Sequence, residues 1–226
     1  MSNANLTSRA LVAILGTTVL AFAAWHAGRL GLADWSSMRS RHEVMAWAEK
    51  RQVPSFERWA RAVDELRSAL RLTPEDPSLH EHLGVAYDLA STALVAPGTP
   101  NVYVEFALVH FRRAAELSPT SPYAWVSVAA IMYRLGRVNE ELYRAYALAM
   151  RYGPWEPAVQ LAASKLGLEL WERLDPALRH EVKQNWQRTA NRQAEQLARI
   201  AIEQHREKLL CAEPIASVRK PLKCDK

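Results

Sequence analysis

Residues 119–154, PTSPYAWVSVAAIMYRLGRVNEELYRAYALAMRYGP, are the stretch that decides the fold. In its first half Trp125, Val128, Ala129 and Met132 follow one another at spacings of three, one and three, so these side chains share one face of a helix. Gly136 interrupts this pattern, and a second apolar stripe follows before the stretch closes on a proline. The stretch therefore predicts two antiparallel helices joined by a short turn.

The second helix carries Leu142, Tyr146 and Ala149, and Pro154 comes five residues after the last of them. The order of a large aromatic, a small residue, a break, an aromatic, a small residue and a proline resembles the tetratricopeptide (TPR) repeat. The small residues let the helix backbones approach, and the aromatics fill the space between them. Because one such hairpin cannot bury its own apolar face, the resemblance implies neighbouring repeats.

The sequence before residues 119–154 contains the neighbouring repeats that this hairpin requires. Leu83-Gly84-Val85-Ala86-Tyr87 matches the same pattern upstream, and the small and apolar residues of the 55–72 segment provide the second half of an earlier, degenerate repeat. We expect an all-α fold: a TPR-like α-solenoid of about three helical hairpins with an N-terminal transmembrane helix and a long C-terminal capping helix. The expected divisions are a membrane anchor (1–35), a connecting helix (36–54), the repeat domain (55–176), the capping helix (177–210) and a flexible basic tail (211–226). The residues that carry the repeat-core signature are Leu83, Gly84, Tyr87, Trp125, Tyr146, Pro154 and Trp155.

One repeat is longer than the other. Pro74 and Pro119 are 45 positions apart, whereas Pro119 and Pro154 are 35 apart. The surplus lies in residues 94–104, whose Ala-Pro-Gly-Thr-Pro-Asn core predicts a loop. Such an insertion is either a tolerated surface loop or a functional one.

The net charge of +5 does not indicate a nucleic-acid-binding surface. From residue 177 onward there are eleven Lys and Arg against six Asp and Glu, whereas residues 1–176 carry eighteen of each. The basic excess therefore belongs to the C-terminal segment and not to the repeats. Hydrophobic residues at 49% and charged residues at 23% are typical of a folded chain.

The two cysteines, Cys211 and Cys224, both lie in the predicted tail. Two are too few for a disulfide framework, and no histidines accompany them in a zinc pattern. They can pair if this part of the chain lies outside the cytoplasm, although nothing in the sequence requires it.

The N-terminus contains sixteen uncharged residues, 10–25, between Arg9 and His26. Continued to residue 33 across Arg29, the segment is long enough to cross a bilayer. A cleavable signal peptide is the main alternative because residues 21–23 form an A-x-A site, and a buried core helix is a further one. We favour an uncleaved anchor in a bacterial inner membrane with the soluble domain in the periplasm, although basic residues on both sides leave the orientation open.

The predicted C-terminal helix has one apolar stripe from Leu178 to Ala201 and a basic opposite face. That face is either the solvated outside of a capping helix or a surface for anionic lipid or an acidic partner. Its members are Arg179, Lys183, Arg188, Arg192, Arg199 and Arg206.

The sequence shows no catalytic constellation, and we expect no enzyme, no cofactor and no metal site. His80 and His82 are two residues apart and therefore point away from each other on a helix. The expected site is instead the groove formed by the first helices of the repeats. The predicted groove or partner-binding residues are Glu81, Asp88, Tyr123, Val126, Tyr133, Arg134 and Lys165, with Ser78, Val85, Ala130, Ala158 and Leu161 at equivalent positions. The tyrosines can stack on sugar or peptide planes, or they can simply pack between repeats.

Beyond the repeat, residues 10–212 resemble the VpsP-type proteins. The likeness is carried by Pro-Tyr-Ala-Trp at 122–125, Gly-Pro-Trp-Glu-Pro at 153–157, Gly167 with Trp171, Ala-Arg-Ile-Ala at 198–201 and Leu-Leu-Cys at 209–211. This resemblance implies a membrane-anchored helical-repeat protein associated with bacterial exopolysaccharide biosynthesis, and it supplies no catalytic residues.

The function that we expect is that of a non-enzymatic scaffold or adaptor for the envelope proteins of a polysaccharide synthesis or export system, tethered to the lipid bilayer through residues 10–33. The alternatives are a glycan-binding accessory module and an envelope-assembly TPR protein unrelated to polysaccharide. We expect neither a nucleic-acid partner nor a small-molecule ligand.

Overall fold

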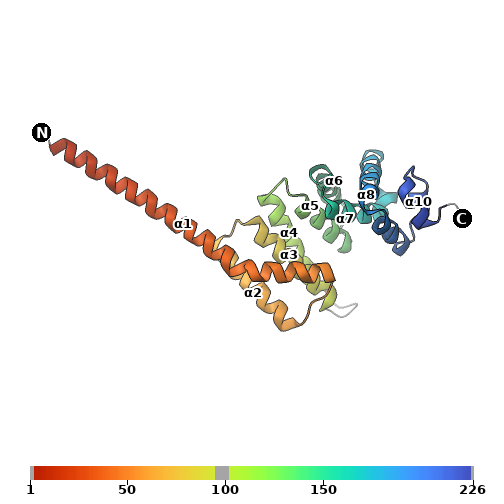
Figure 1. Cartoon of the computed structure of the whole chain (residues 1–226), viewed down its shortest axis with the longest axis horizontal. Coiled ribbons are helices and arrows are strands. Elements are labelled where there is room, and N and C mark those ends of the chain that lie inside the picture. Colours follow the sequence, from red (N-terminus) through yellow and green to blue (C-terminus); the bar gives the residue numbers. More distant parts are fainter. Residues whose placement is uncertain (1–2, 95–101, 225–226) are drawn as a thin grey trace. The chain divides into compact units, whose positions relative to one another are not determined.

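The computed structural model of the chain describes residues 3–94 and 102–224, with side chains from residue 11 onward. Within these ranges every regular element is a helix, which confirms the predicted all-α, TPR-like fold class (Figure 1). The helices are α1 (Asn3–Lys50), α2 (Phe56–Leu72), α3 (Pro77–Ala93), α4 (Val102–Leu117), α5 (Pro122–Arg134), α6 (Glu140–Tyr152), α7 (Pro157–Leu170), α8 (Pro176–Glu203), α9 (Glu207–Cys211) and α10 (Ala216–Leu222), with a 3₁₀ turn at Trp171–Arg173. The core of the predicted 94–104 insertion lies outside the described residues.

Local sequence signals determine where the helices begin. The N-caps of α2, α3, α5, α6 and α8 are Ser55, Asp76, Ser121, Asn139 and Asp175, and each side chain accepts a hydrogen bond from a backbone N–H in the first turn. Helices α3, α5, α7 and α8 also start on a proline, whose missing N–H has no helical acceptor at that position. The predicted break after α5 occurs at Gly136, which has a φ of 70°.

The chain divides into two compact units, Met1–Thr99 and Pro100–Lys226. In unit 1 the C-terminal half of α1 packs on α2 and α3. Its inner face consists of Ala33, Ser37, Ser40, Val44 and Trp47, all buried, at spacings of four, three, four and three. The hydroxyl groups of both buried serines are hydrogen-bonded. Ser37 Oγ donates to Ala33 O within α1 at 2.7 Å, and Ser40 Oγ donates to the Glu65 carboxylate on α2.

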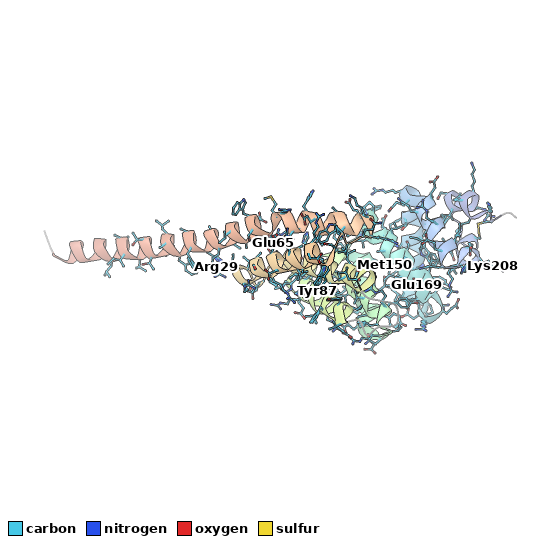
Figure 2. All side chains as sticks on the ribbon, turned by 90° about the horizontal axis from the view of Figure 1, so that it is seen from below. Arg29, Glu65, Tyr87, Met150, Glu169 and Lys208 are labelled. Atoms are coloured by element: carbon cyan, nitrogen blue, oxygen red, sulfur yellow. A yellow bond between two sulfur atoms is a disulfide. The ribbon has the colours of Figure 1, made fainter. Side chains whose placement is uncertain are left out.

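This packing corrects the prediction of a separate connecting helix at 36–54. The expected boundary between residues 35 and 36 falls inside α1, and the second half of α1 is the first helix of the hairpin that α2 completes. Arg29, which Figure 2 labels, marks the start of the packed half. Its guanidinium donates to Leu72 O at the end of α2. Arg41 adds ion pairs to Asp34 at 3.0 Å and to Asp76 at 3.7 Å.

In the N-terminal half of α1, the described side chains of residues 11–28 make no such contacts. Residues 11–28 are exposed along their whole length, and this part of the helix extends away from α2 and α3 (Figure 1). The segment is long and apolar enough to cross a membrane, with a mean hydropathy of 1.7. Its exposure argues against the core-helix alternative, because a core helix would be covered by other elements.

In unit 2, α4 packs on α5, and α5–α6 and α7–α8 form successive hairpins. The core between the hairpins contains Tyr146, Val182 and Trp186, each 0% exposed. Tyr146 donates its buried hydroxyl to Ala163 O at 2.7 Å, and the ring of Trp186 lies 5.0 Å from that of Trp171. The predicted stripe of α8 is buried except at Ala194, which is half-buried. The helix is kinked next to it at Gln193, whose side-chain amide donates to Pro157 O at 2.9 Å.

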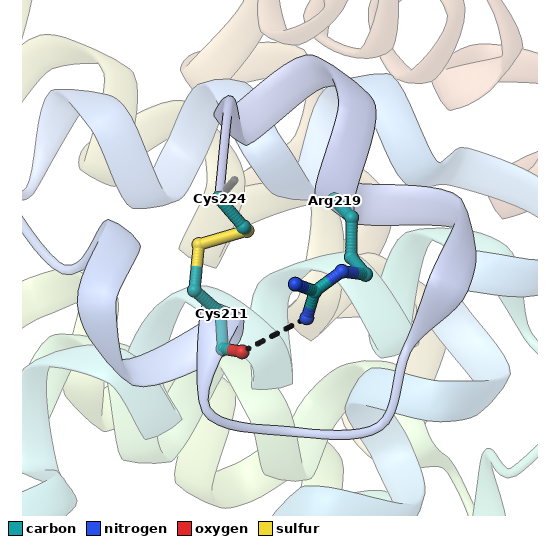
Figure 3. The surroundings of a disulfide bond; sticks show 3 residues. All are labelled: Cys211, Arg219 and Cys224. Carbon is teal, nitrogen blue, oxygen red and sulfur yellow. Dashed lines mark hydrogen bonds between the residues drawn. A yellow bond between two sulfur atoms is a disulfide. The ribbon is translucent and has the colours of Figure 1, made fainter. Parts of the chain in front are cut away.

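The predicted flexible tail is wrong for the described residues up to 224. α10 packs on α8, and Ile215, Val218 and Leu222 are buried at spacings of three and four. Ser217 Oγ donates to Ala190 O at 3.2 Å. A disulfide joins Cys211 to Cys224, and Arg219 donates to Cys211 O at 3.5 Å inside the closed loop (Figure 3). The capping helix correspondingly ends at Glu203 and is itself covered by α10.

Candidate functional site

The predicted groove residues belong to both units, and each unit is described by itself. In unit 1, Ser78, Glu81, Val85 and Asp88 lie half-buried on α3. His80 on the same helix is 9% exposed, and its Nε2 lies 3.2 Å from Pro74 O. It therefore packs against the preceding turn and does not face a ligand position.

In unit 2 the first helices of the two hairpins, α5 and α7, pack side by side and bring the predicted Tyr133 and Lys165 to one polar cluster. The centre of this cluster is Glu169, one turn after Lys165 on α7. Gln204, the C-cap residue of α8, donates from Nε2 to Glu169 Oε1 at 2.6 Å and to Lys165 O at 3.4 Å. We name Tyr133, Lys165, Glu169 and Gln204 the Glu169 cluster.

Burial governs the charge of this cluster. Partial desolvation raises the pKa of Glu169 above its usual value, while the charge of Lys165 and hydrogen bonds from Gln204 and Tyr133 oppose that rise. The Oε1 atom of Gln204 is buried and has no hydrogen-bond partner among the described residues. The cluster thus offers a half-buried carboxylate and an exposed ammonium group at one surface, which suits polar contacts to a partner.

A second predicted tyrosine lies at the other end of the same two helices. Tyr123, at the start of α5, donates to Glu156 Oε2 at 2.6 Å, and Glu156 precedes α7. Tyr152, the last residue of α6, and Trp155, in the α6–α7 turn, are also exposed, Trp155 by 66%. Three aromatic side chains therefore face solvent around the α6–α7 turn, and we name Tyr123, Tyr152 and Trp155 the aromatic edge.

Other predicted residues do not join these groups. Val126 is 7% exposed and belongs to the core of unit 2, so its assignment to the groove is wrong. Arg134 is exposed at the end of α5 and Ala130 is exposed one turn earlier. Glu81 and Asp88 belong to unit 1, so their place in a shared groove stays a prediction.

The residues of the repeat-core signature differ in burial. Leu83, Gly84, Tyr87 and Tyr146 are buried, as a core role requires. Trp125 and Pro154 are only half-buried, and Trp125 Nε1 donates to Pro119 O at 2.8 Å in the preceding turn. The exposure of Trp155 contradicts its assignment to the core.

Sequence reasoning missed Glu169 and Gln204. The signal for Glu169 was its spacing of four from Lys165, which places the two side chains on one helical face. Gln204 carried no comparable signal, because its position depends on where α8 ends and on the kink at Gln193.

Comparison with known proteins supports the repeat assignment. The chain is 34% identical over 101 residues to Superkiller complex protein 3 of Mus musculus and 32% identical over 101 residues to Tetratricopeptide repeat protein 37 of Xenopus laevis. Each match covers 45% of this chain and 6% of the relative, so the chain spans a small part of the length of these proteins. No family model matches. With the helical hairpins, these matches support a TPR-like repeat fold.

Proposed function

We propose that this chain is a membrane-anchored adaptor that binds protein partners through the α5–α7 face of unit 2. The observation that carries the proposal is the continuity of α1, whose first half is an exposed apolar helix and whose second half is built into the repeat fold. A helix rise of about 1.5 Å per residue gives the segment 11–28 a length of about 27 Å, close to the hydrocarbon thickness of a bilayer. Lipid would cover the apolar side chains that unit 1 leaves uncovered.

The disulfide supports a location for unit 2 outside the cytoplasm. A bond between Cys211 and Cys224 persists in an oxidising compartment and is reduced in most cytosols. Together with one membrane-crossing helix at the N-terminus, the disulfide supports the proposal that the repeats lie in the periplasm and that the chain is anchored in a bacterial inner membrane. A signal peptide cleaved after residue 23 would leave the fold intact, because Arg29 is the first residue with a described side chain that bonds to α2.

The partners that we propose are proteins of an exopolysaccharide synthesis or export system, and this step rests on the VpsP-type resemblance alone. The Glu169 cluster supplies polar contacts for such a partner, and the exposed Ala130 and Ala158 leave room for its backbone. No step of this function requires a cofactor or a catalytic residue.

Co-purification from solubilised membranes tests the adaptor function. The full chain should recover an envelope glycosyltransferase, polymerase or export protein, and the variant Lys165→Ala should recover less of it. The matched control is Arg61→Ala, which removes an exposed cation from α2 in unit 1. Equal recovery of the partner by the wild type and by Lys165→Ala would exclude the α5–α7 face, and recovery of no envelope component would exclude the adaptor function.

The aromatic edge favours a second candidate, a glycan-binding module. Exposed aromatic rings stack on sugar faces, and Glu156 and Arg192 lie beside these rings, since Arg192 donates to Trp155 O at 3.3 Å. Titration of the full chain in detergent with purified polysaccharide should then shift its tryptophan fluorescence. Trp155→Ala should abolish the shift, and an unchanged wild-type spectrum would exclude this candidate.

A further inference from the structure

The second helices of the two hairpins, α6 and α8, enclose a solvent-open hollow of about 560 Å³. It shares no residue with the Glu169 cluster or the aromatic edge. Its lining residues are Arg144, Ala147, Leu148, Met150, Arg151, Pro154, Glu181, Gln184 and Arg188. Three arginines thus lie beside apolar side chains, and among the lining residues one carboxylate, that of Glu181, offsets part of their positive charge.

None of these three arginines forms an ion pair with a described residue. By contrast, Arg112 holds both oxygens of Glu141 at 2.7 and 2.8 Å, and Lys183 lies 2.7 Å from Glu213. The Nε atom of Arg188 is buried in the wall of the hollow and has no acceptor among the described residues. A buried donor without a partner is costly, so an acceptor that enters the hollow would gain from satisfying it.

The spacing of the charges suits an extended chain. Arg144 and Arg151 are seven residues apart on α6, or about 10 Å along the helix axis. Carboxylates three residues apart on a peptide in the extended polyproline II conformation lie on one face and are separated by about 9 Å. Arginine binds carboxylates with paired hydrogen bonds, and Arg188 faces α6 from the other wall of the hollow.

The remaining lining distinguishes a peptide from a phosphate group. Leu148, Met150 and Pro154 offer apolar contact, which inorganic phosphate cannot use. Glu181 repels carboxylates and phosphate alike, but the backbone N–H groups of a peptide can also donate hydrogen bonds to it. The chemistry of the hollow therefore matches a segment that carries two carboxylates, apolar side chains and backbone donors.

We propose that this hollow binds a short acidic segment of a partner protein, with its carboxylates on Arg144, Arg151 and Arg188. The site is additional to the α5–α7 face, so one protein can contact two partners or two parts of one partner. Its failure leaves the proposed adaptor function untouched, because the two sites share no residue.

Fluorescence anisotropy of the full chain in nonionic detergent tests the site. The probe is a labelled peptide, Leu-Glu-Ala-Pro-Glu-Leu, and its control replaces both glutamates with glutamine. Binding should be selective for the acidic peptide, and Arg144→Gln and Arg151→Gln should each weaken it by about tenfold because each removes a charge-assisted hydrogen bond. Arg188→Lys keeps the charge and should weaken binding by losing the paired geometry.

Arg61→Gln on α2 in unit 1 serves as the matched control, since it removes an exposed arginine far from the hollow in sequence and should leave the affinity unchanged. Because Arg144 and Arg151 are exposed, their loss should leave the helical circular dichroism unaltered. Equal affinity for the glutamine peptide, or for the Arg144→Gln variant, would overturn the proposal. Binding of inorganic phosphate or of anionic phosphatidylglycerol vesicles in place of the peptide would overturn it as well.

Discussion

Gly167→Ala tests the packing between the two hairpins of unit 2. A Cβ atom at this position would lie 2.5 Å from Tyr146 Oη and 2.7 Å from Val182 Cγ1. Both neighbours are 0% exposed, so neither side chain can move into solvent. The added methyl group must displace the tyrosine hydroxyl from Ala163 O, to which it donates at 2.7 Å.

The expected cost follows from three contributions. Overpacking a filled core costs about 1–3 kcal/mol. Loss of the buried tyrosine hydrogen bond costs about 1–3 kcal/mol. Replacing a helical glycine with alanine returns about 1 kcal/mol. The net loss of local unfolding free energy should therefore be about 3 kcal/mol.

Hydrogen exchange of the amides in α7 and α8 measures this loss in unit 2 alone, because exchange reports local opening. Tyr146→Phe removes the nearest atom, so Gly167→Ala should cost about 1–2 kcal/mol less in that background. Gly28→Ala is the control, since nothing lies within 4 Å of a Cβ at that position. Unchanged exchange in Gly167→Ala, or the same cost in both backgrounds, would refute the proposed packing.

Three further perturbations test other parts of the fold. Cys224→Ser should release α10 from α8 and reduce protection of α9–α10 by about 3 kcal/mol, the stabilisation expected for a loop with a sequence separation of 13; unchanged exchange of these helices would contradict it. The fold raises the pKa of Glu169 above its value in the unfolded chain. Its contribution to the free energy of unfolding is therefore greatest below the unfolded pKa, where the side chain is protonated, and is lost as the pH rises through the folded pKa. The melting temperature of Glu169→Gln should consequently rise relative to that of the wild type as the pH increases from acid to neutral. A difference in melting temperature that stays constant over this range would count against the raised pKa. A chain starting at His26 should melt like the full chain, whereas one starting at Ser36 should melt lower because it lacks Arg29 and the buried Ala33; equal melting of the two would show that the packed part of α1 begins later.

The sequence predicts the hairpins of unit 2 well because their signals are local. Trp125 to Met132 give a helical period, Gly136 provides the left-handed turn residue, and prolines open the next helices. The fold class follows from these signals, since amphipathic helices with short turns must stack to bury their apolar faces.

The errors have physical causes of two kinds. The second half of α1 was assigned to a connector because Ser37 and Ser40 are polar, yet they bury by bonding to the helix itself and to Glu65. The sequence past Leu210 predicts a loose tail because it shows no helical period, and α10 is too short, at seven residues, to establish one. Hydrophobic periodicity in the sequence predicts neither the serine hydrogen bonds nor the pairing of the cysteines.

The candidate site was only partly predictable for a related reason. Tyr133 and Lys165 were identified from their positions on the first helices of the repeats. The hollow between α6 and α8 was not, although Arg188 had been noted on the basic face of the last helix. Its character comes from the absence of carboxylate partners among the described residues, and that depends on how the second helices pack.

The central claim is that α1 crosses a membrane with its first half and belongs to the repeat fold with its second. Alkaline extraction of membranes tests it most directly, because this treatment releases peripheral proteins and leaves membrane-crossing helices in the pellet. The full chain should stay in the pellet, and the chain starting at His26 should be released into the supernatant as a folded helical protein. Release of the full chain, or unfolding of the shorter one, would contradict the account.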